Sequence, residues 1–309
     1  MADLPLAWSK SSLGTLVDGC SWQYALEKVY GIPSHGSPQT AMGTAYHAAI
    51  EWYLRRLLLQ QRDGIEDYFP FEDALAEGMR VLFEEVEDLP EEQWALHDLD
   101  LPALSGQLEA ALTNWWETPI PEGQPGEGES LRERFERWRI VAIEPYFRTN
   151  VADGVTSTHG YIDVLAWDPD CGVWVVVDHK TASSYGRWPH DGGGHELEGS
   201  VYVVGAELAD ALPVFGPVRM EWHVVRKKLS QHARFEGVRC VEMYVTDIHR
   251  LWMEDTLKIA DRIVTNDAFE TNPGWNLCSP KWCPYFRGCQ VDGDLHPSAL
   301  AGTQQPAGV

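Results

Sequence analysis

The spacing of apolar residues divides the chain into a helical first part and a mixed second part. Ser9, Ser11 and Ser12 are residues that often cap helices, and Gly31 with Pro33 ends the helical pattern that follows them. Apolar residues recur at helical spacing in the stretches 13–30, 40–61, 71–86 and 101–116. The pattern therefore predicts an N-terminal helical region.

A proline- and glycine-rich linker at 119–129 separates this region from a second part with a different pattern. Short apolar or alternating runs predict strands at 138–147, 160–167, 172–178, 218–226 and 238–245. Helical spacing returns at 196–212 and, after the plausible cap Asp247, up to residue 263. This order predicts an α/β protein with a central mixed sheet flanked by helices and an N-terminal helical elaboration.

The length of 309 residues is sufficient for a full hydrophobic core, and we expect a single domain over 1–309. Within it, the sequence predicts a helical region at 9–130, a core at 131–268 and a cysteine-rich segment at 269–292. The polar end of the chain, 293–309, is rich in proline, glycine and glutamine and is expected to be disordered.

The composition indicates the cellular compartment in which the protein is expected. Hydrophobic residues make up 44% of the chain and charged residues 23%, which is ordinary for a globular protein. We find no apolar run that could span a bilayer and no basic region followed by an apolar core at the N-terminus, so we expect a cytoplasmic protein without a membrane partner. Six cysteines in that compartment indicate reduced thiols or metal ligands rather than disulfides.

The formal net charge of −23 argues against a protein that coats DNA through a basic surface. The acidic residues are concentrated between Asp63 and Asp100, whereas arginines and lysines gather at 132–139 and 226–228. An acidic surface remote from a site is compatible with basic stretches that face phosphates. For any single arginine, an ordinary solvated surface position is the simpler interpretation.

Two of the predicted strands carry carboxylates. Asp163 lies in the run 160–167. Asp178 directly follows the apolar run 174–177, and Lys180 comes two residues later. Alternate residues of a strand share a face, so Asp178 and Lys180 should point the same way and His179 should point to the opposite face. Two acids can hold Mg²⁺ or Mn²⁺ while a lysine faces a scissile phosphate. For the dipeptide spacing alone, an exposed Asp–Lys pair at a strand end is the simpler interpretation.

The cysteines near the C-terminus form a second candidate centre. Cys278, Cys283 and Cys289 lie within a loop broken by prolines, and Cys20 is the best fourth ligand. The other two, Cys171 and Cys240, fall in a predicted turn and a predicted strand. Four thiolates bind zinc or an iron–sulfur cluster, which spacing alone does not separate, and a role without metal is a third interpretation.

In order along the chain, these residues resemble the PD-(D/E)XK nuclease superfamily, specifically its RecB-like iron–sulfur exonuclease branch. That branch includes the CRISPR-adaptation-associated exonucleases and AddB-type nuclease domains. The resemblance extends from Ser9 to Cys289 and rests on an ordered set of motifs: Cys20, Gly43-Thr-Ala-Tyr-His47, Glu144-Pro-Tyr-Phe147, Gly160-Tyr-Ile-Asp163, Val177-Asp-His-Lys180, a helix with Tyr202, and the three terminal cysteines.

The resemblance implies a restriction-endonuclease-like core and a role for each matching residue. His47, Asp163 and Asp178 would be metal ligands. Lys180 would stabilise the charge developing on phosphorus or orient the attacking water. A 4Fe-4S cluster would be held by the cysteine set Cys20, Cys278, Cys283 and Cys289.

Two departures from the family pattern concern this chain. Glu198, four residues before Tyr202 on one helix face, stands where the family has a glutamine. A glutamate repels phosphate, so Glu198 is expected to contact metal or base instead, and both residues are included in the predicted catalytic set. The gap between Cys278 and Cys283 is also longer than is common in the branch, which a loop accommodates.

The function expected from this resemblance is a Mg²⁺- or Mn²⁺-dependent DNA exonuclease that acts on single-stranded DNA or frayed duplex ends. One alternative is a non-catalytic DNA-end-binding protein that serves as an adaptation or recombination partner. A site-specific endonuclease is another, which the lack of a separate DNA-reading region in the sequence disfavours. No GxxxxGK[ST] loop is present, so a helicase partner would be a separate chain.

Overall fold

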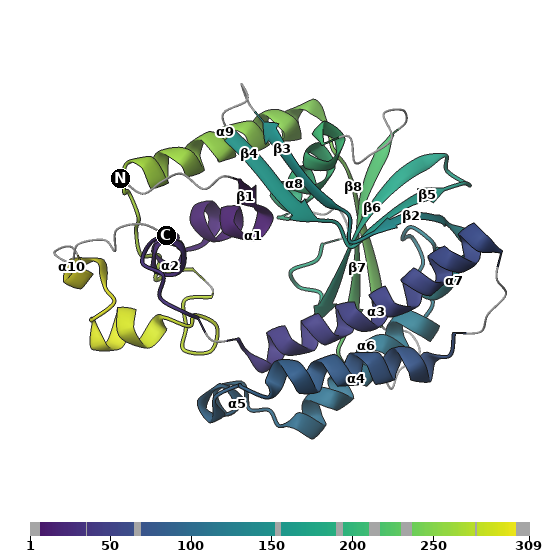
Figure 1. The fold of residues 1–309 in the computed structure, drawn as a ribbon, viewed down its shortest axis with the longest axis horizontal. Helices are drawn as coiled ribbons and strands as arrows, with labels where there is room; N and C mark the ends of the chain where they lie inside the picture. The colour runs from purple at the N-terminus through teal and green to yellow at the C-terminus, as the bar shows by residue number, and fades with distance from the viewer. Residues whose placement is uncertain are drawn as a thin grey trace.

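The computed structural model describes residues 7–34, 36–64, 69–151, 156–189, 194–209, 217–229, 237–275 and 277–300. Two sheets form its centre, a five-stranded sheet with the order β2-β5-β6-β7-β8 and a three-stranded sheet with the order β1-β4-β3 (Figure 1). Strands β6 and β7 are parallel and the other neighbours in the larger sheet are antiparallel. The predicted mixed sheet is confirmed.

The helical elements are α1 (Lys10–Leu13), α2 (Ser21–Tyr24), α3 (Pro38–Asp63), α4 (Phe71–Val86), α5 (Glu91–His97), α6 (Leu101–Glu117), α7 (Leu131–Arg137), α8 (Glu196–Leu208), α9 (Asp247–Thr265) and α10 (Pro297–Leu300), with π-helical turns η1 (Gly14–Gly19), η2 (Ala25–Val29) and η3 (Arg287–Asp292). The strands are β1 (Trp8–Ser9), β2 (Arg139–Ile143), β3 (Tyr146–Val151), β4 (Thr156–Tyr161), β5 (Val164–Asp168), β6 (Val173–Ala182), β7 (Val218–Arg226) and β8 (Val238–Tyr244).

Strand β6 lies at the centre of the large sheet and separates two hydrophobic cores. Val175 and Val177 pack into the core shared with α3, α4 and α6, whereas Trp174 and Val176 pack into the core shared with α8, α9 and the N-terminal arm, residues 7–34. This alternation follows from the two-residue period of a strand. It explains why β6 is almost uniformly apolar until Asp178, since both of its faces are covered.

Helix α3 carries one of the predicted ligands and has strong signals at both ends. The Ser37 side chain accepts a hydrogen bond from the Thr40 backbone N–H, Pro38 occupies the first turn, and Gly64 ends the helix with φ of 65°. Glycine adopts this left-handed conformation without strain, so the end of α3 follows from its sequence.

Two predicted strands are each divided between the sheets. The run 138–147 forms β2 and β3, and the run 160–167 forms β4 and β5. The first division falls at Glu144, whose φ of 53° interrupts the extended backbone. The Glu144 N–H donates to the Asp163 carbonyl at 3.1 Å, so both chains change sheet at the same point.

The predicted helix 13–30 is also interrupted, because Cys20 has an extended backbone (φ −122°, ψ 103°) between η1 and α2. Helices α5 and α7 were not predicted from the sequence. Short helices flanked by prolines or charged residues give little apolar periodicity, which explains their absence from the prediction.

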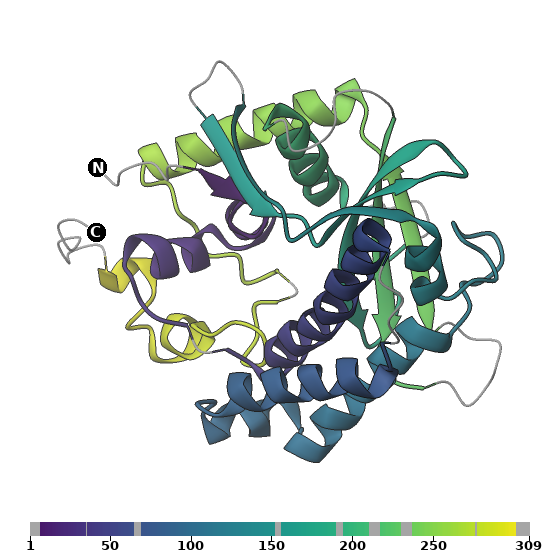
Figure 2. The same ribbon diagram turned by 45° about the vertical axis from the view of Figure 1, so that its right-hand side comes forward.

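The N-terminal arm lies beside the C-terminal segment, which comprises residues 269–275 and 277–300 (Figure 2). The Trp22 indole donates to the Leu295 carbonyl at 2.8 Å, and the Tyr285 hydroxyl donates to the Ile32 carbonyl at 2.7 Å. Residues 293–300 were expected to belong to a disordered tail, but they include α10. Leu295 packs against the hydrophobic core, which removes apolar surface from water and holds this part of the chain in place. The rest of that expected tail, 301–309, lies outside the described residues.

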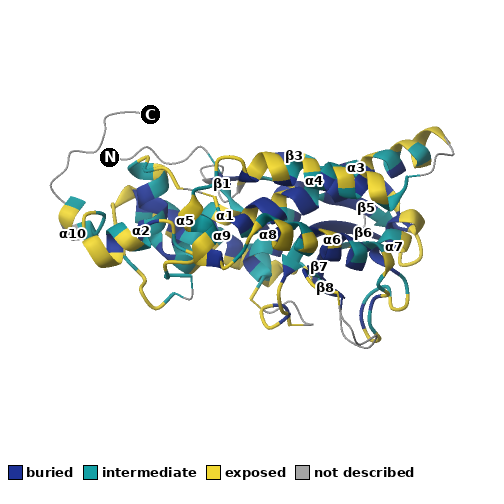
Figure 3. Cartoon of the chain, turned by 90° about the horizontal axis from the view of Figure 1, so that it is seen from below, coloured by how far each residue is buried: buried dark blue, intermediate teal, exposed yellow. Residues whose placement is uncertain are grey.

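Buried residues follow the inner faces of the helices and strands, while exposed residues cover their outer faces (Figure 3). Among the residues that the structure describes, the helices lack the length and apolar character needed to cross a membrane.

Candidate functional site

Three potential metal ligands converge where the two sheets meet. His47 comes from α3, Glu144 from the link between β2 and β3, and Asp163 from the link between β4 and β5. One ligand atom from each lies within 4.8 Å of the others. An imidazole with two carboxylates suits a divalent cation such as Mn²⁺ or Mg²⁺, so these residues fit a divalent-metal site.

The convergence has a local cause in the paired change of sheet. Because Glu144 and Asp163 lie opposite each other where both chains pass from one sheet to the other, their side chains are brought together at one point. Asp163 Oδ2 accepts the backbone N–H of His179 at 2.6 Å and lies 3.4 Å from His47 Nδ1. Three elements distant in the sequence therefore fix the orientation of this carboxylate.

The electrostatics of the three-residue group favour a bound cation. Burial and, to a smaller extent, the charges of Asp163 and Glu51 together raise the pKa of Glu144 to about 7. Burial also raises the pKa of Asp163, against the opposing effect of His47. Crowded carboxylates in a poorly solvated place resist ionisation until positive charge compensates them.

Asp178 and Lys180 lie on the same face of β6, as the strand period predicts. Lys180 Nζ forms an ion pair with Asp178 and lies 3.1 Å from Glu198 Oε1 on α8. Burial disfavours the charged form of Asp178, but the charges of Lys180 and Lys10 outweigh it and lower its pKa. The same partnership raises the pKa of Lys180, with Asp178 overcoming the effect of burial.

The predicted opposite orientation of His179 is confirmed. Its ring is buried on the other face of the sheet, 5.7 Å from the ring of Phe135 and 6.4 Å from that of Trp115. Its backbone N–H nevertheless serves the site by binding Asp163. His179 therefore contributes packing through its side chain and positioning through its main chain.

Of the three predicted ligands, the structure groups His47 and Asp163 with Glu144, while Asp178 is bound to Lys180 beside them. The role of Asp178 as a ligand remains a prediction. Glu144 was quoted as part of a motif but given no role. A signal for it was present, because Pro145 follows it directly and prolines commonly mark the end of a strand.

A second lysine at this site was missed by the sequence analysis. Lys10, the first residue of α1, forms an ion pair with Glu198 Oε1, the oxygen that also faces Lys180. Burial lowers the pKa of Lys10 to about 7, against the opposing effect of Asp178. Nothing in the local sequence indicates this role, because Lys10 lies among serines at the start of a short helix.

Tyr202 follows Glu198 by one turn of α8, and the two share a helix face as predicted. Its ring lies 6.4 Å from that of Phe147, and Lys10 Nζ lies 5.7 Å from its centre. Burial raises the pKa of Tyr202 above its usual range, so its hydroxyl is held in the neutral form at physiological pH.

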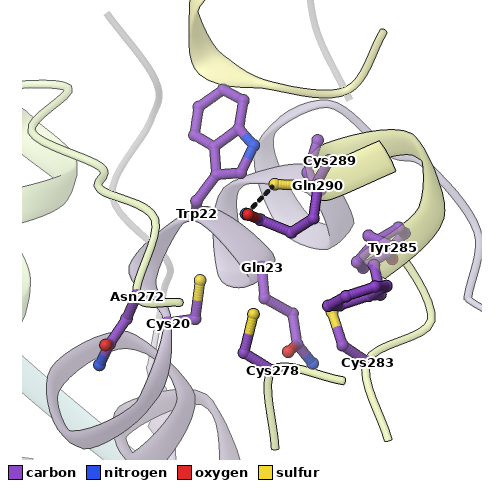
Figure 4. A pocket seen from close by; sticks show the side chains of 11 residues that line it. Cys20, Trp22, Gln23, Asn272, Cys278, Cys283, Tyr285, Cys289 and Gln290 are labelled. Carbon is purple, nitrogen blue, oxygen red and sulfur yellow. Dashed lines mark hydrogen bonds between the residues drawn. The ribbon is translucent and has the colours of Figure 1, made fainter. Parts of the chain in front are cut away.

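The four predicted cysteines line one cavity between the N-terminal arm and the C-terminal segment (Figure 4). The lining includes Cys20, Cys278, Cys283 and Cys289, and the cavity has a volume of about 20 Å³. Burial raises the pKa of Cys283 to about 11, and the Gln290 amide lies 3.2 Å from Cys289 Sγ. In the described parts of the chain, these sulfurs do not form a group within 4.8 Å of one another.

Comparison with known proteins gives one family. The model of the PD-(D/E)XK nuclease superfamily matches residues 7–290. A crystal structure named "Putative exonuclease", from Eubacterium rectale, is similar with a TM-score of 0.49 and 14% identity, covering 98% of this chain and 90% of that one. A likeness of this size adds nothing to the family assignment. No curated protein matches.

Proposed function

The chain belongs to the PD-(D/E)XK nuclease superfamily, and from this premise we propose that it is a metal-dependent DNA exonuclease acting on single-stranded or frayed ends. The observation that carries the proposal is the placement of His47, Glu144 and Asp163 beside the Asp178–Lys180 pair. This arrangement places a cation-binding set and a lysine in one partly buried site, and metal-assisted hydrolysis of a phosphodiester uses groups of both kinds.

The residues proposed to hold Mg²⁺ or Mn²⁺ are His47, Glu144 and Asp163, with Asp178 as a further ligand. A divalent cation in such a site supplies Lewis acidity and lowers the pKa of a bound water. The donors are preorganised, because the His179 N–H holds Asp163 and the Glu144 backbone is bonded to the partner strand. A preorganised site loses less free energy to reordering when the substrate binds.

Lys180 is proposed to offset the negative charge that develops on the phosphate during hydrolysis. Its ammonium group is held between Asp178 and Glu198, which fixes its position and keeps it protonated. A fixed charge in a poorly solvated site stabilises a transition state more than a mobile surface charge would. Glu198 therefore acts as a partner of this lysine in the proposed site.

The cysteine cavity is proposed to hold a 4Fe-4S cluster. A mononuclear zinc site has Zn–S bonds of about 2.3 Å in a tetrahedron, which places its sulfurs about 3.8 Å apart. Among the described residues, no three of the sulfurs that line this cavity all lie within 4.8 Å of one another, so they are not gathered as tightly as one zinc ion requires. A larger group bound by four thiolates fits that spacing better than one zinc ion. The cluster would tie the N-terminal arm to the C-terminal segment.

The nuclease proposal is tested with end-labelled linear oligonucleotides and circular single-stranded DNA, each incubated with Mg²⁺ or Mn²⁺. An exonuclease degrades the linear single strand stepwise and leaves the circle intact. Cleavage of the circle supports the endonuclease alternative. Binding of ends without any cleavage supports the non-catalytic alternative and refutes the proposed activity.

A further inference from the structure

Glu198 poses an electrostatic problem that the proposed function leaves open. Its carboxylate lies 3.1 Å from Nζ of Lys180, the lysine that the proposed function assigns to the substrate phosphate. An uncompensated carboxylate near a phosphate weakens binding, because like charges repel strongly where water is scarce. We propose that Lys10 compensates Glu198 and, together with Lys180, forms a paired ammonium site that receives the substrate phosphate.

The contacts of Lys10 carry this inference. Lys10 Nζ forms an ion pair with Glu198 Oε1, the same oxygen that faces Lys180. Glu198 is therefore shared by two ammonium groups, and its second oxygen lies 3.6 Å from His195 Nδ1. The shared carboxylate allows two positive groups to lie close together, which their mutual repulsion would otherwise oppose.

A charge count gives the same conclusion. The described part of the site contains four carboxylates and two ammonium groups: Glu144, Asp163, Asp178 and Glu198, with Lys10 and Lys180. With both lysines protonated and the carboxylates ionised by binding of a divalent cation, their charges sum to zero (−4 + 2 + 2). Without Lys10 the occupied site would remain negative and would repel DNA.

The position of Lys10 is fixed by contacts of the residues that precede it in the N-terminal arm. Ser9 caps α1 directly before it, and β1 pairs with β4 through Trp8 and Thr158. The Trp8 indole also donates to Asp261 on α9 at 2.7 Å. These contacts hold the start of α1 against the core, and they therefore fix the position of Lys10 beside the site.

The inference rests on the proposed nuclease function. It is tested by removing or keeping the charge at Lys10 and by removing the charge at Glu198. The variants are Lys10→Met, Lys10→Arg, Glu198→Gln and the double variant Lys10→Met with Glu198→Gln. Lys28→Met is the matched control, because it removes an exposed lysine paired with Glu27 on the same N-terminal arm. The readouts are binding of a fluorescein-labelled single strand in EDTA at several salt concentrations, and kcat/KM with Mn²⁺.

Loss of Lys10 should weaken DNA binding and lower kcat/KM by about tenfold to a hundredfold, the range of a charge-assisted contact. The salt dependence of binding should also become shallower, because one phosphate contact is lost. Lys10→Arg should retain most of the activity. Adding Glu198→Gln to Lys10→Met should restore most of the binding, since it removes the uncompensated charge. Lys28→Met should behave as the wild type.

Unchanged binding and cleavage in a folded Lys10→Met protein would overturn the inference while leaving the nuclease assignment intact. A double variant as defective as Lys10→Met would also overturn it, because Lys10 would then not act through Glu198. A wild-type protein that neither binds nor cleaves DNA would refute the proposed function and the role of Lys10 together.

Discussion

Glu144 and Asp163 are held together where two paired chains change sheet, so their protonation is coupled to metal binding. The pKa of Glu144 is raised to about 7. Below that pH its carboxyl group carries a proton that a cation must displace. Affinity for Mn²⁺ should therefore fall by about tenfold for each pH unit below about 7, as measured by calorimetry.

Glu144→Gln provides the control for this pH dependence. The amide cannot ionise, so its affinity for Mn²⁺ should be lower at neutral pH and much less dependent on pH. A wild-type affinity that stays constant between about pH 5.5 and 7 would exclude Glu144 as a titrating ligand.

Asp178 and Lys180 share one face of β6 and form a buried ion pair. Asp178→Ala should reduce cleavage by at least about a thousandfold, and Lys180→Ala by about 10²–10³-fold, because each removes fixed charge from the reacting phosphate or its metal. Single-turnover cleavage of a labelled strand measures both effects. Asp88→Ala, at an exposed position after α4, is the control and should be neutral.

Both variants must be shown to fold, by circular dichroism and thermal melting, before their activities are compared. A folded Asp178→Ala protein that cleaves DNA at the wild-type rate would remove Asp178 from the site.

Single residues of the site were only partly predictable from the sequence. The two-residue period of a strand correctly predicted that the side chains of Asp178 and Lys180 lie on one face of β6 and that of His179 on the other. The role of His47 came from the family resemblance, whereas the strand pattern had already indicated Asp163 as one of two carboxylates that could hold a metal. Lys10 could not be predicted, since its role depends on a contact with Glu198 across 188 positions of sequence (198 − 10) that no local pattern records.

At the scale of elements, the packing of α8 on the sheet depends on a glycine. A Cβ on Gly205 would overlap the Phe147 ring of β3. Gly205→Ala should therefore lower the free energy of unfolding by about 1–3 kcal/mol through overpacking, although alanine favours helices. Denaturant unfolding measures the change.

Gly106, in the middle of α6, is the matched control. A Cβ there would meet no atom within 4 Å, so Gly106→Ala should stabilise the protein by about 0.5–1 kcal/mol. Equal effects of the two substitutions would show that the contact between α8 and β3 is looser than described.

The extent of the long elements followed well from the sequence, whereas their division did not. Strand β7 and helix α4 begin and end at the predicted residues, 218–226 and 71–86. The run that contains Glu144 and the run that contains Asp163 were each predicted as a single strand, because the hydrophobic pattern continues on both sides of these residues. Their change of sheet depends on a positive φ and on cross-strand bonds, which are tertiary features.

At the scale of the whole molecule, the cysteine cavity joins the two ends of the described chain. If it holds a 4Fe-4S cluster, the purified protein should be brown and contain iron and sulfide. Cys283→Ser should bleach the protein and lower its melting temperature, because the cluster links the N-terminal arm to the C-terminal segment. Elemental analysis and thermal melting under anaerobic conditions provide the measurements.

Cys171→Ser is the control, since Cys171 is exposed and does not line the cavity. It should leave colour and stability unchanged. Stoichiometric zinc without iron would refute the cluster while leaving the nuclease site untouched, because the cavity and the carboxylate site use different residues.

The metal site at the junction of the two sheets is tested most directly by titrating Mn²⁺ against wild-type protein and Asp163→Ala. Manganese binding and cleavage of a labelled single strand should be followed in the same samples. The wild type should bind Mn²⁺ and cleave the strand, while a folded Asp163→Ala protein should lose both, because Asp163 belongs to the group with His47 and Glu144. Metal-dependent cleavage that persists in the folded Asp163→Ala protein would contradict the assignment of the site.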